Sequence, residues 1–164
     1  MTLAARHIVH IQTEDFDHAA LYAQVRSQLG GELGAVVSFV GLVRDKLDGA
    51  SADTQQVATL TLEHYPGMTE SSIENIVSEA CERWPLLASR VVHRIGTLQP
   101  TEQIVLVVVA SSHRDAAFAG AEFIMDYLKT KAVLWKREVT DQQDYWVESK
   151  QSDYQRAQSW HDDA

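Results

Sequence analysis

The sequence predicts an α+β fold in which helices pack on a mostly antiparallel sheet. Apolar β-branched stretches of strand length recur along the chain, and longer segments carry apolar residues with the helical period. The order of these elements favours the α+β class. The chain has 164 residues, 45% of them hydrophobic, and no linker, internal repeat or low-complexity tract. The whole span 1–164 is therefore expected to form one domain with a substantial core.

The first part of the chain is expected to hold two strands around a helix. Residues His7–Gln12 alternate weakly, which is typical of an edge strand. Residues 15–29 carry an apolar helical stripe that ends at a pair of glycines, as helices commonly do. Residues 35–43 read AVVSFVGLV, and this apolar, β-branched composition predicts a buried strand. The polar, glycine-containing segment 45–56 has no period and is expected to be a mobile surface loop.

The middle of the chain predicts a strand, a helix and two further strands. Residues 57–65 alternate apolar and polar side chains, which indicates a strand with one buried face. Residues 69–84 carry a helical apolar stripe that Pro85 terminates. A short strand is expected at 90–95. The continuous apolar run 103–110, QIVLVVVA, predicts a strand in the centre of its sheet.

A long helix should follow, from 112 to about 130. Ser112 stands at its expected cap, and Asp115 three residues later completes a capping-box pattern. Residues 133–139 and 145–148 predict two strands joined by a polar turn.

Composition limits the possible functions. The formal net charge of -9 argues against general binding to nucleic acid, which needs a broad basic face. No run of about 18 apolar residues predicts a transmembrane helix. The start of the chain has no apolar segment typical of a secretion signal, so a cytoplasmic protein is expected. The polar tail 150–164 is expected to fray or to form a short helix.

Cations are concentrated in one segment of this acidic protein, residues 111–138. Its basic residues are His113, Arg114, Lys129, Lys131, Lys136 and Arg137. Apolar residues surround them, which indicates an ordered site rather than a loose basic tail. An acidic protein that gathers cations in this way is expected to bind an anion.

The start of the long helix is one candidate for that site. Backbone N–H groups and the helix dipole favour an anion there, and His113 and Arg114 would add an imidazole and a guanidinium. A capped helix with two solvated side chains explains the same pattern. At the other end of the helix, Lys129 and Lys131 complement the negative end of the dipole, which is by itself a sufficient structural reason for them.

Two further basic positions lie on or next to expected strands. Lys136 and Arg137 alternate on a strand, so only one of them enters a given pocket. Lys136 follows a tryptophan, and a lysine that is partly desolvated among other cations has a lowered pKa, which suits proton transfer or nucleophilic attack. Arg44 ends the strand 35–43, where it could reach an anion or simply be solvated.

Several other chemistries lack support. Glu63 and His64 are adjacent on a strand and point to opposite faces, with no further ligand at metal spacing, so no metal site is expected. The single cysteine, Cys81, excludes an intramolecular disulfide, and its place on an apolar helical stripe favours a core residue over a sulfur-carrying nucleophile. Motifs of nucleotide-binding loops and serine hydrolases are absent, and no cofactor is expected.

Four stretches resemble the large, catalytic subunit of molybdopterin synthase. They are GAVVSFVGLVR (34–44), LTLEHYPGMTE (60–70), RWPL with VVHRIG (83–96), and SSHRDAAFAGAEFIMDYLKTKAVLWKRE (111–138). They run in family order and cover most of the chain from Gly34 to Trp146. The first 30 residues match only loosely.

The resemblance implies a fold of the α/β-hammerhead type and a central homodimer within a heterotetramer. Each copy would bind a small ubiquitin-like sulfur-carrier subunit whose Gly-Gly thiocarboxylate enters the active site. Two sulfurs would pass to cyclic pyranopterin monophosphate and form the molybdopterin dithiolene. The resemblance makes Lys129 and Lys136 the catalytic candidates. The implied substrate-binding residues are Val43, Arg44, His113, Arg114, Lys129, Lys136, Arg137 and Glu138.

Two other functions stay open from the sequence. One is a non-enzymatic dimeric α+β module that binds an anionic ligand or a protein tail and does not need both lysines. The other is a transferase that acts on a different phosphorylated metabolite.

Overall fold

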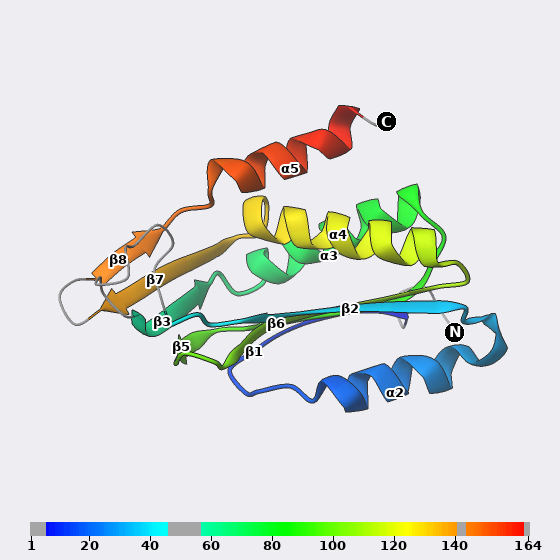
Figure 1. The fold of residues 1–164 in the computed structure, drawn as a ribbon, viewed down its shortest axis with the longest axis horizontal. Coiled ribbons are helices and arrows are strands. Elements are labelled where there is room, and N and C mark those ends of the chain that lie inside the picture. Colours follow the sequence, from blue (N-terminus) through cyan, green and yellow to red (C-terminus); the bar gives the residue numbers. More distant parts are fainter. Residues whose placement is uncertain (1–5, 46–56, 141–143, 163–164) are drawn as a thin grey trace.

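A computed structural model describes residues 6–45, 57–140 and 144–162 of the chain. Its first sheet has four strands, and its order from edge to edge is β1 (His7–Gln12), β4 (Leu86–Arg94), β6 (Gln103–Ser111) and β2 (Ala35–Leu42). β1 runs parallel to β4, and the other two pairs are antiparallel. This sheet forms the long central layer of the molecule (Figure 1).

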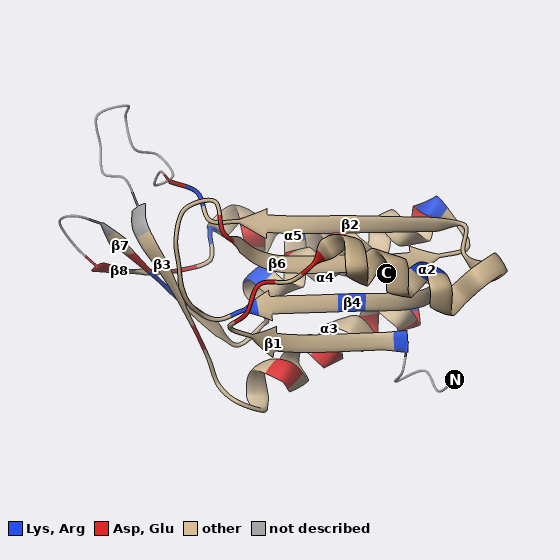
Figure 2. Ribbon diagram, turned by 90° about the horizontal axis from the view of Figure 1, so that it is seen from below, with Lys and Arg blue, Asp and Glu red and all other residues tan. Residues whose placement is uncertain are grey.

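A second four-stranded sheet lies at one end of the first. Its order is β5 (Gly96–Leu98), β3 (Val57–His64), β7 (Leu134–Thr140) and β8 (Asp144–Val147), with every neighbouring pair antiparallel. Figure 2 shows these strands running across the direction of the first sheet. The α+β class with mostly antiparallel pairing is therefore confirmed, although the strands form two sheets.

Helices cover both faces of the first sheet. α2 (His18–Leu29), followed by the 3-10 turn η1 (Gly30–Glu32), lies on one face, while α3 (Met68–Arg83) and α4 (Arg114–Thr130) lie side by side on the other (Figure 1). α5 (Gln151–Asp162) packs on α4. Within the described ranges, no helix has the length and apolar character needed to span a bilayer.

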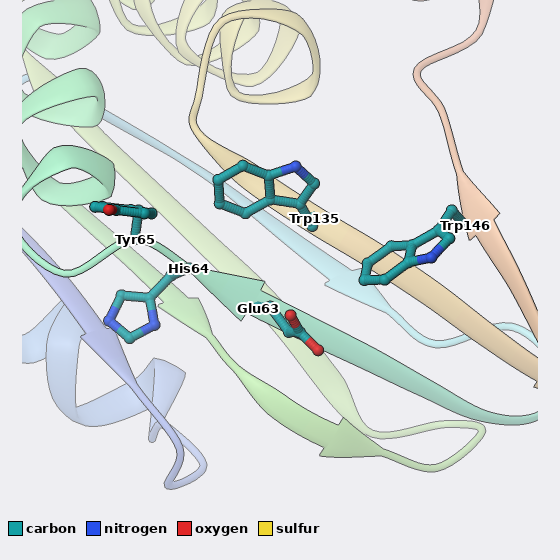
Figure 3. A pocket seen from close by; sticks show the side chains of 5 residues that line it. All are labelled: Glu63, His64, Tyr65, Trp135 and Trp146. Atoms are coloured by element: carbon teal, nitrogen blue, oxygen red, sulfur yellow. The ribbon is translucent and has the colours of Figure 1, made fainter.

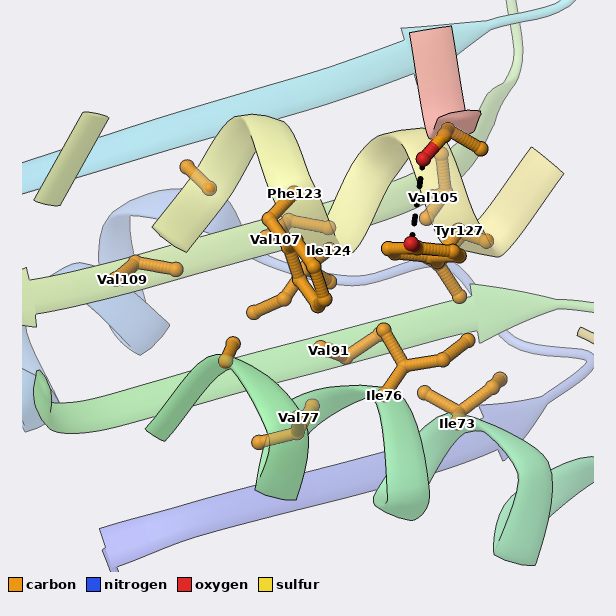
Figure 4. Packing of buried hydrophobic residues seen from close by; sticks show 14 residues of the cluster. Ile73, Ile76, Val77, Val91, Val105, Val107, Val109, Phe123, Ile124 and Tyr127 are labelled. Atoms are coloured by element: carbon orange, nitrogen blue, oxygen red, sulfur yellow. Dashed lines mark hydrogen bonds between the residues drawn. The ribbon is translucent and has the colours of Figure 1, made fainter. Parts of the chain in front are cut away.

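The main core fills the space between the first sheet and the pair α3 and α4. Valines of β4 and β6 meet isoleucines of α3 and aromatic residues of α4 there, and Phe123 and Ile124 are fully buried (Figure 4). A second cluster lies under α2 and includes Val25 and Leu106. Burial of this apolar surface is the main stabilising term of the fold, at roughly 25 cal/mol for each Å² removed from water.

Most elements agree with the sequence, and three details differ. The strand predicted as buried at 35–43 is the edge strand β2, where Phe39 and Leu42 are 42% and 52% exposed. The short strand expected at 90–95 is the nine-residue inner strand β4, and β5 was not expected. The loop expected at 45–56 lies almost wholly outside the described residues. β1 is an edge strand and β6 an inner one, as predicted.

The capping box predicted at Ser112 is wrong. His113 is the N-cap of α4 and makes no side-chain capping hydrogen bond. The Ser112 hydroxyl instead donates to the main-chain oxygen of Glu32 over 3.1 Å. The chain passes so close here that a Cβ on Gly34 would lie 1.9 Å from the Ser112 carbonyl oxygen. This packing constraint involves residues almost 80 positions apart, which a local pattern does not reveal.

The polar tail forms the ordered helix α5 rather than fraying. Its Trp160 indole donates to Asp126 Oδ2 over 2.8 Å and packs edge-on against Trp84 and Phe123. The Tyr127 hydroxyl donates to the Ala157 carbonyl over 3.2 Å (Figure 4). The tail therefore packs against the main core through Ala157 and Trp160.

Candidate functional site

One face of β7 carries the first part of the candidate site. Lys136 pairs across the ladder with Leu62, and Glu138 pairs with Leu60. Directly paired residues point to the same side of a sheet, so both charged side chains lie on the face of the buried leucines. The apolar cluster on that face consists of Val43, Leu60, Leu62 and Leu98. Lys136 thus lies against apolar surface, as expected, but this surface is the leucine cluster and not Trp135, which points to the opposite face.

The environment of Lys136 lowers its pKa. Burial is the larger cause, and the positive charge of Lys129 is the second. The carboxylates of Asp153 and Glu138 act in the opposite direction. The two lysines, which are seven residues apart in the sequence, are therefore close enough to repel each other. A partly desolvated lysine next to another cation has the properties of an acid–base or nucleophilic amine.

Lys129 extends from the last turn of α4 toward the same region. Its side chain is 49% exposed, and its Nζ lies 3.7 Å from Asp153 Oδ1 in the first turn of α5. Lys131 takes a different course, because its Nζ lies over the Tyr127 ring, 4.0 Å from the centroid. Only Lys129 thus faces Lys136, while Lys131 has a packing role at the helix end.

Glu138 on β7 and Arg44, just beyond the end of β2, complete the cluster. Burial raises the pKa of Glu138, while the charges of Arg44 and Lys136 oppose that rise. Arg44 directly follows Val43, which is 5% exposed. The Val43 main chain is held on both sides, since its N–H donates to Glu102 over 2.9 Å and its oxygen accepts from Thr101 over 2.8 Å. This anchoring places Arg44 at the end of β2, beside β7.

Arg137 lies on the other face of β7. It alternates with Lys136 and pairs with Thr61 and Trp146, and its guanidinium lies 3.7 Å from Asp144. The prediction that only one of the two neighbours enters a given pocket agrees with this alternation. Lys136, with its lowered pKa and its place beside Lys129, is the one that belongs to the cluster.

His113 and Arg114 stand apart from this cluster. They begin α4, and Lys129 lies in its last turn. At 1.5 Å per residue the two ends of this helix are separated by roughly 25 Å. The Arg114 side chain is 84% exposed and lies 3.6 Å from the exposed Asp115. A single copy of the chain therefore brings together Arg44, Lys129, Lys136 and Glu138, but not the two residues at the helix start.

The structure adds His93, which the sequence reasoning missed. This residue of β4 is 5% exposed, and burial lowers its pKa to about 4, with a smaller contribution from the charge of Lys136. Its Nδ1 donates to the Arg94 carbonyl over 2.8 Å. With a pKa of about 4 the ring is neutral at pH 7, which leaves Nε2 as the acceptor. The strand 90–95 was predicted, but nothing in its pattern pointed to a histidine next to Lys136.

A separate hollow opens on the side of the second sheet where Trp135 lies. It measures about 490 Å³ and is lined by Glu63, His64, Tyr65, Trp135 and Trp146 (Figure 3). No lysine or arginine lines it, so it lacks the cations that an anionic substrate requires. Across the described ranges, no group of three or more histidine, cysteine or carboxylate side chains is arranged to hold a metal.

Cys81 is only partly buried, against the main core. Its Sγ lies 3.6 Å from both ring nitrogens of His7, and burial raises the pKa of its thiol to about 11. A thiol with this pKa is protonated at neutral pH and is a poor nucleophile. The interpretation of Cys81 as a packing residue agrees with these properties.

Comparison with known proteins identifies the family. The family model described as "MoaE protein" matches residues 11–131, which is well over half of the chain. This chain belongs to the MoaE family. A protein of Vibrio cholerae named molybdopterin synthase catalytic subunit is 52% identical to it over 154 residues, and the match covers 94% of this chain and 98% of that protein.

Solved structures share the fold. A molybdopterin biosynthesis MoaE protein from Burkholderia ambifaria is 44% identical to this chain and superposes with a TM-score of 0.77. The match covers 93% of this chain and 97% of that protein. A chain from a complex of subunits 1 and 2 of the molybdopterin-converting factor of Helicobacter pylori is 19% identical, with a TM-score of 0.68, covering 87% of this chain and 91% of that one. At that identity the second match supports the fold alone. The fold expected from the resemblance is thus confirmed.

Proposed function

We propose that this chain is the catalytic subunit of a molybdopterin synthase. In the proposed reaction, two sulfurs pass from the thiocarboxylated C-terminus of a small ubiquitin-like carrier subunit to cyclic pyranopterin monophosphate and become the dithiolene of molybdopterin. Membership of the MoaE family and the names of its relatives support this assignment. The observation within the molecule that carries it is the lysine pair, in which the charge of Lys129 lowers the pKa of Lys136.

The two lysines have different roles in the proposal. The half-exposed Lys129 acts at the reacting carbon or carbonyl, as an acid–base catalyst or a transient nucleophile. Lys136 supports it, because burial and the neighbouring charge increase the fraction of neutral amine at a given pH. Both lysines also supply positive charge where the thiocarboxylate and the developing oxyanion need it.

The remaining candidate residues serve substrate binding. Arg44, His113 and Arg114 are the proposed partners of the phosphate and the pterin, since guanidinium and imidazole groups bind phosphate oxygens well. Val43 anchors Arg44, and Glu138 lies between the charges of Arg44 and Lys136. A substrate contact by Arg137 stays a prediction, and its place on the other face of β7 argues against one in the same cavity.

The sulfur must come from another chain. Cys81 is the only cysteine, and its thiol is protonated at neutral pH and lies at the main core instead of beside the lysines. The proposed partner is therefore the small carrier subunit.

A second copy of this chain is the proposed source of His113 and Arg114 for each site. Large apolar side chains are exposed on the free edge strand β2 and on α4, namely Phe39, Leu42 and Phe118 at 42%, 52% and 62%. Exposed apolar patches of this kind mark interaction surfaces. A twofold contact along β2 would run the two α4 helices in opposite directions and bring the start of one toward the end of the other.

Reconstitution tests the proposed function. The purified chain is mixed with thiocarboxylated carrier and cyclic pyranopterin monophosphate, and the dithiolene product is measured, with unmodified carrier as the control. Product that depends on the thiocarboxylate supports the synthase. Binding of the carrier tail without product indicates the non-enzymatic module, and binding of neither ligand indicates a transferase for another metabolite.

The cytoplasmic location and the formation of one domain by residues 1–164 stay predictions.

A further inference from the structure

The start of α5 is held at a fixed place next to the end of α4. Three contacts near its other end anchor the helix: Trp160 to Asp126, Tyr127 to Ala157, and the Arg83 guanidinium to the Trp160 carbonyl over 2.7 Å. Because a helix transmits such anchoring along its axis, its first turn has little freedom. Any side chain in that turn therefore has a defined position relative to Lys129.

Asp153 occupies this first turn, and its two carboxylate oxygens contact different groups. Oδ2 accepts the Lys150 N–H over 3.3 Å, while the Asp153 N–H donates to the Lys150 carbonyl over 2.9 Å. These local bonds are those of a helix start, and they fix the orientation of the carboxylate. Oδ1 is left to face Lys129 Nζ at 3.7 Å.

The ion pair between Asp153 and Lys129 is asymmetric. The Asp153 side chain is 16% exposed, against 49% for Lys129, so the carboxylate is the fixed member and the lysine is the adjustable one. A second contact from the same segment reaches the same residue, since the Ser149 hydroxyl donates to the Lys129 carbonyl. The segment 149–153 thus contacts both the main chain and the ammonium group of Lys129.

The charge of Asp153 also acts on Lys136, where it opposes the lowering of the pKa by burial and by Lys129. One carboxylate therefore interacts with both lysines, which repel each other. An ion pair with a half-exposed lysine contributes little to the free energy of folding. Placement of a reacting group, in contrast, affects rate strongly.

We propose that Asp153 is a positioning residue for sulfur transfer, which holds the Lys129 ammonium in a fixed place beside Lys136. The inference rests on the proposed function, in which Lys129 acts at the reacting carbon. α5 lies outside the segment matched by the family model, so the structure extends the site to the end of the chain.

The test compares Asp153→Asn and Asp153→Glu in the full chain, assembled with thiocarboxylated carrier and substrate. We expect Asp153→Asn to lower kcat by about 10- to 100-fold, with KM changed less than about twofold, because a misplaced group costs rate rather than affinity. Asp153→Glu keeps the charge and should recover most of that loss. The pH profile of Asp153→Asn should shift toward lower pH, because loss of the carboxylate lowers the pKa of Lys136.

Glu32→Gln is the control. It removes an exposed carboxylate that lies 3.4 Å from the Arg6 guanidinium and takes no part in anchoring α5, so kcat should not change. An NMR titration of Lys136 without substrate adds a readout independent of activity, and its pKa should fall in Asp153→Asn.

Two results overturn the inference alone. One is an Asp153→Asn protein with kcat within about twofold of the unaltered chain, since positioning losses are larger. The other is an Asp153→Glu protein as impaired as Asp153→Asn, which would assign the loss to the fold of α5 rather than to the charge. If the unaltered chain makes no dithiolene while the Lys136 pKa still responds to Asp153, the proposed function fails and the positioning role fails with it.

Discussion

The two ends of α4 present cations in contrasting surroundings. At its C-terminal end, Lys129 meets Asp153 and the partly buried Lys136, and the charges of these residues influence one another. At its N-terminal end, Arg114 is 84% exposed and its recorded ion-pair partner is the equally exposed Asp115. The first arrangement is a site within one copy of the chain. The second is the part that, in the proposed dimer, a second copy would bring to the lysines.

The contrast shows what a cluster of basic residues in a sequence means. Residues 111–138 look like one unit in the printed sequence, but a helix of 17 residues holds their first and last parts roughly 25 Å apart. The concentration of basic residues in the sequence therefore indicated an anionic ligand. It did not show that these residues lie in two separate places on the folded chain. The proposed reaction uses both groups at the same substrate.

The largest effect is expected from Lys129→Ala. Loss of an acid–base or nucleophilic group lowers rates by about 10²- to 10⁴-fold, and dithiolene formation should fall by that factor while carrier binding is retained. Lys131→Ala is the matched control, because this neighbouring lysine lies over the Tyr127 ring and not in the cluster. Comparable losses of dithiolene formation in both variants would contradict a special role for Lys129 at the end of the helix.

The second prediction concerns the buried His93 and the pH dependence of stability, and the expected effect is intermediate in size. The pKa of His93 is about 4 in the folded chain against 6.5 for an ordinary histidine, so the unfolded chain binds more protons between these values. Stability should therefore fall as the pH drops from about 6.5 to 4, by about 3 kcal/mol in total.

Urea unfolding of the unaltered chain and of His93→Gln across this pH range measures that loss. The variant lacks the titrating group, so its stability should depend less steeply on pH. Equal slopes for the two proteins would mean that His93 does not titrate as its burial implies.

The smallest effect is expected on the other face of β7. Asp144→Asn removes the exposed carboxylate 3.7 Å from Arg137. Exposed ion pairs of this kind contribute less than about 1 kcal/mol, so thermal denaturation should show only a slight shift. Dithiolene formation should be unchanged, since this face lies away from Lys136. A clear loss of activity would extend the site to Arg137 and weaken the contrast between the two faces.

Much of the fold followed from local pattern. The apolar stripe at 69–84 predicted α3 and the apolar run 103–110 predicted an inner strand, because burial leaves a pattern of apolar residues in the sequence. The helix at 112–130 was also predicted correctly, although the capping box that marked its start is not formed. The edge position of β2 left no such trace, since its exposed Phe39 and Leu42 are as apolar as buried residues.

The candidate site was only partly accessible from the sequence. A lowered pKa was expected for Lys136 as a partly desolvated lysine among cations, and burial and the charge of Lys129 do lower it. The sequence did not reveal that Lys129 is the cation concerned. Asp153 and His93 did not stand out, because they reach the lysines from α5 and β4 through tertiary packing that no spacing encodes. The distance between His113 and Lys129 follows from the length of the predicted helix. The structure adds that no other element carries further residues from the helix start to the lysines within the described part of one copy.

The claim that both ends of α4 serve one substrate is tested most directly by mixing two inactive variants. Lys129→Ala and Arg114→Ala chains are exchanged and then assayed with thiocarboxylated carrier. In a twofold dimer that pairs opposite helix ends, half of the dimers are mixed and each has one intact site, so activity should return to about a quarter of the normal value. Activity that stays at the level of the separate variants would contradict a site completed by the second copy.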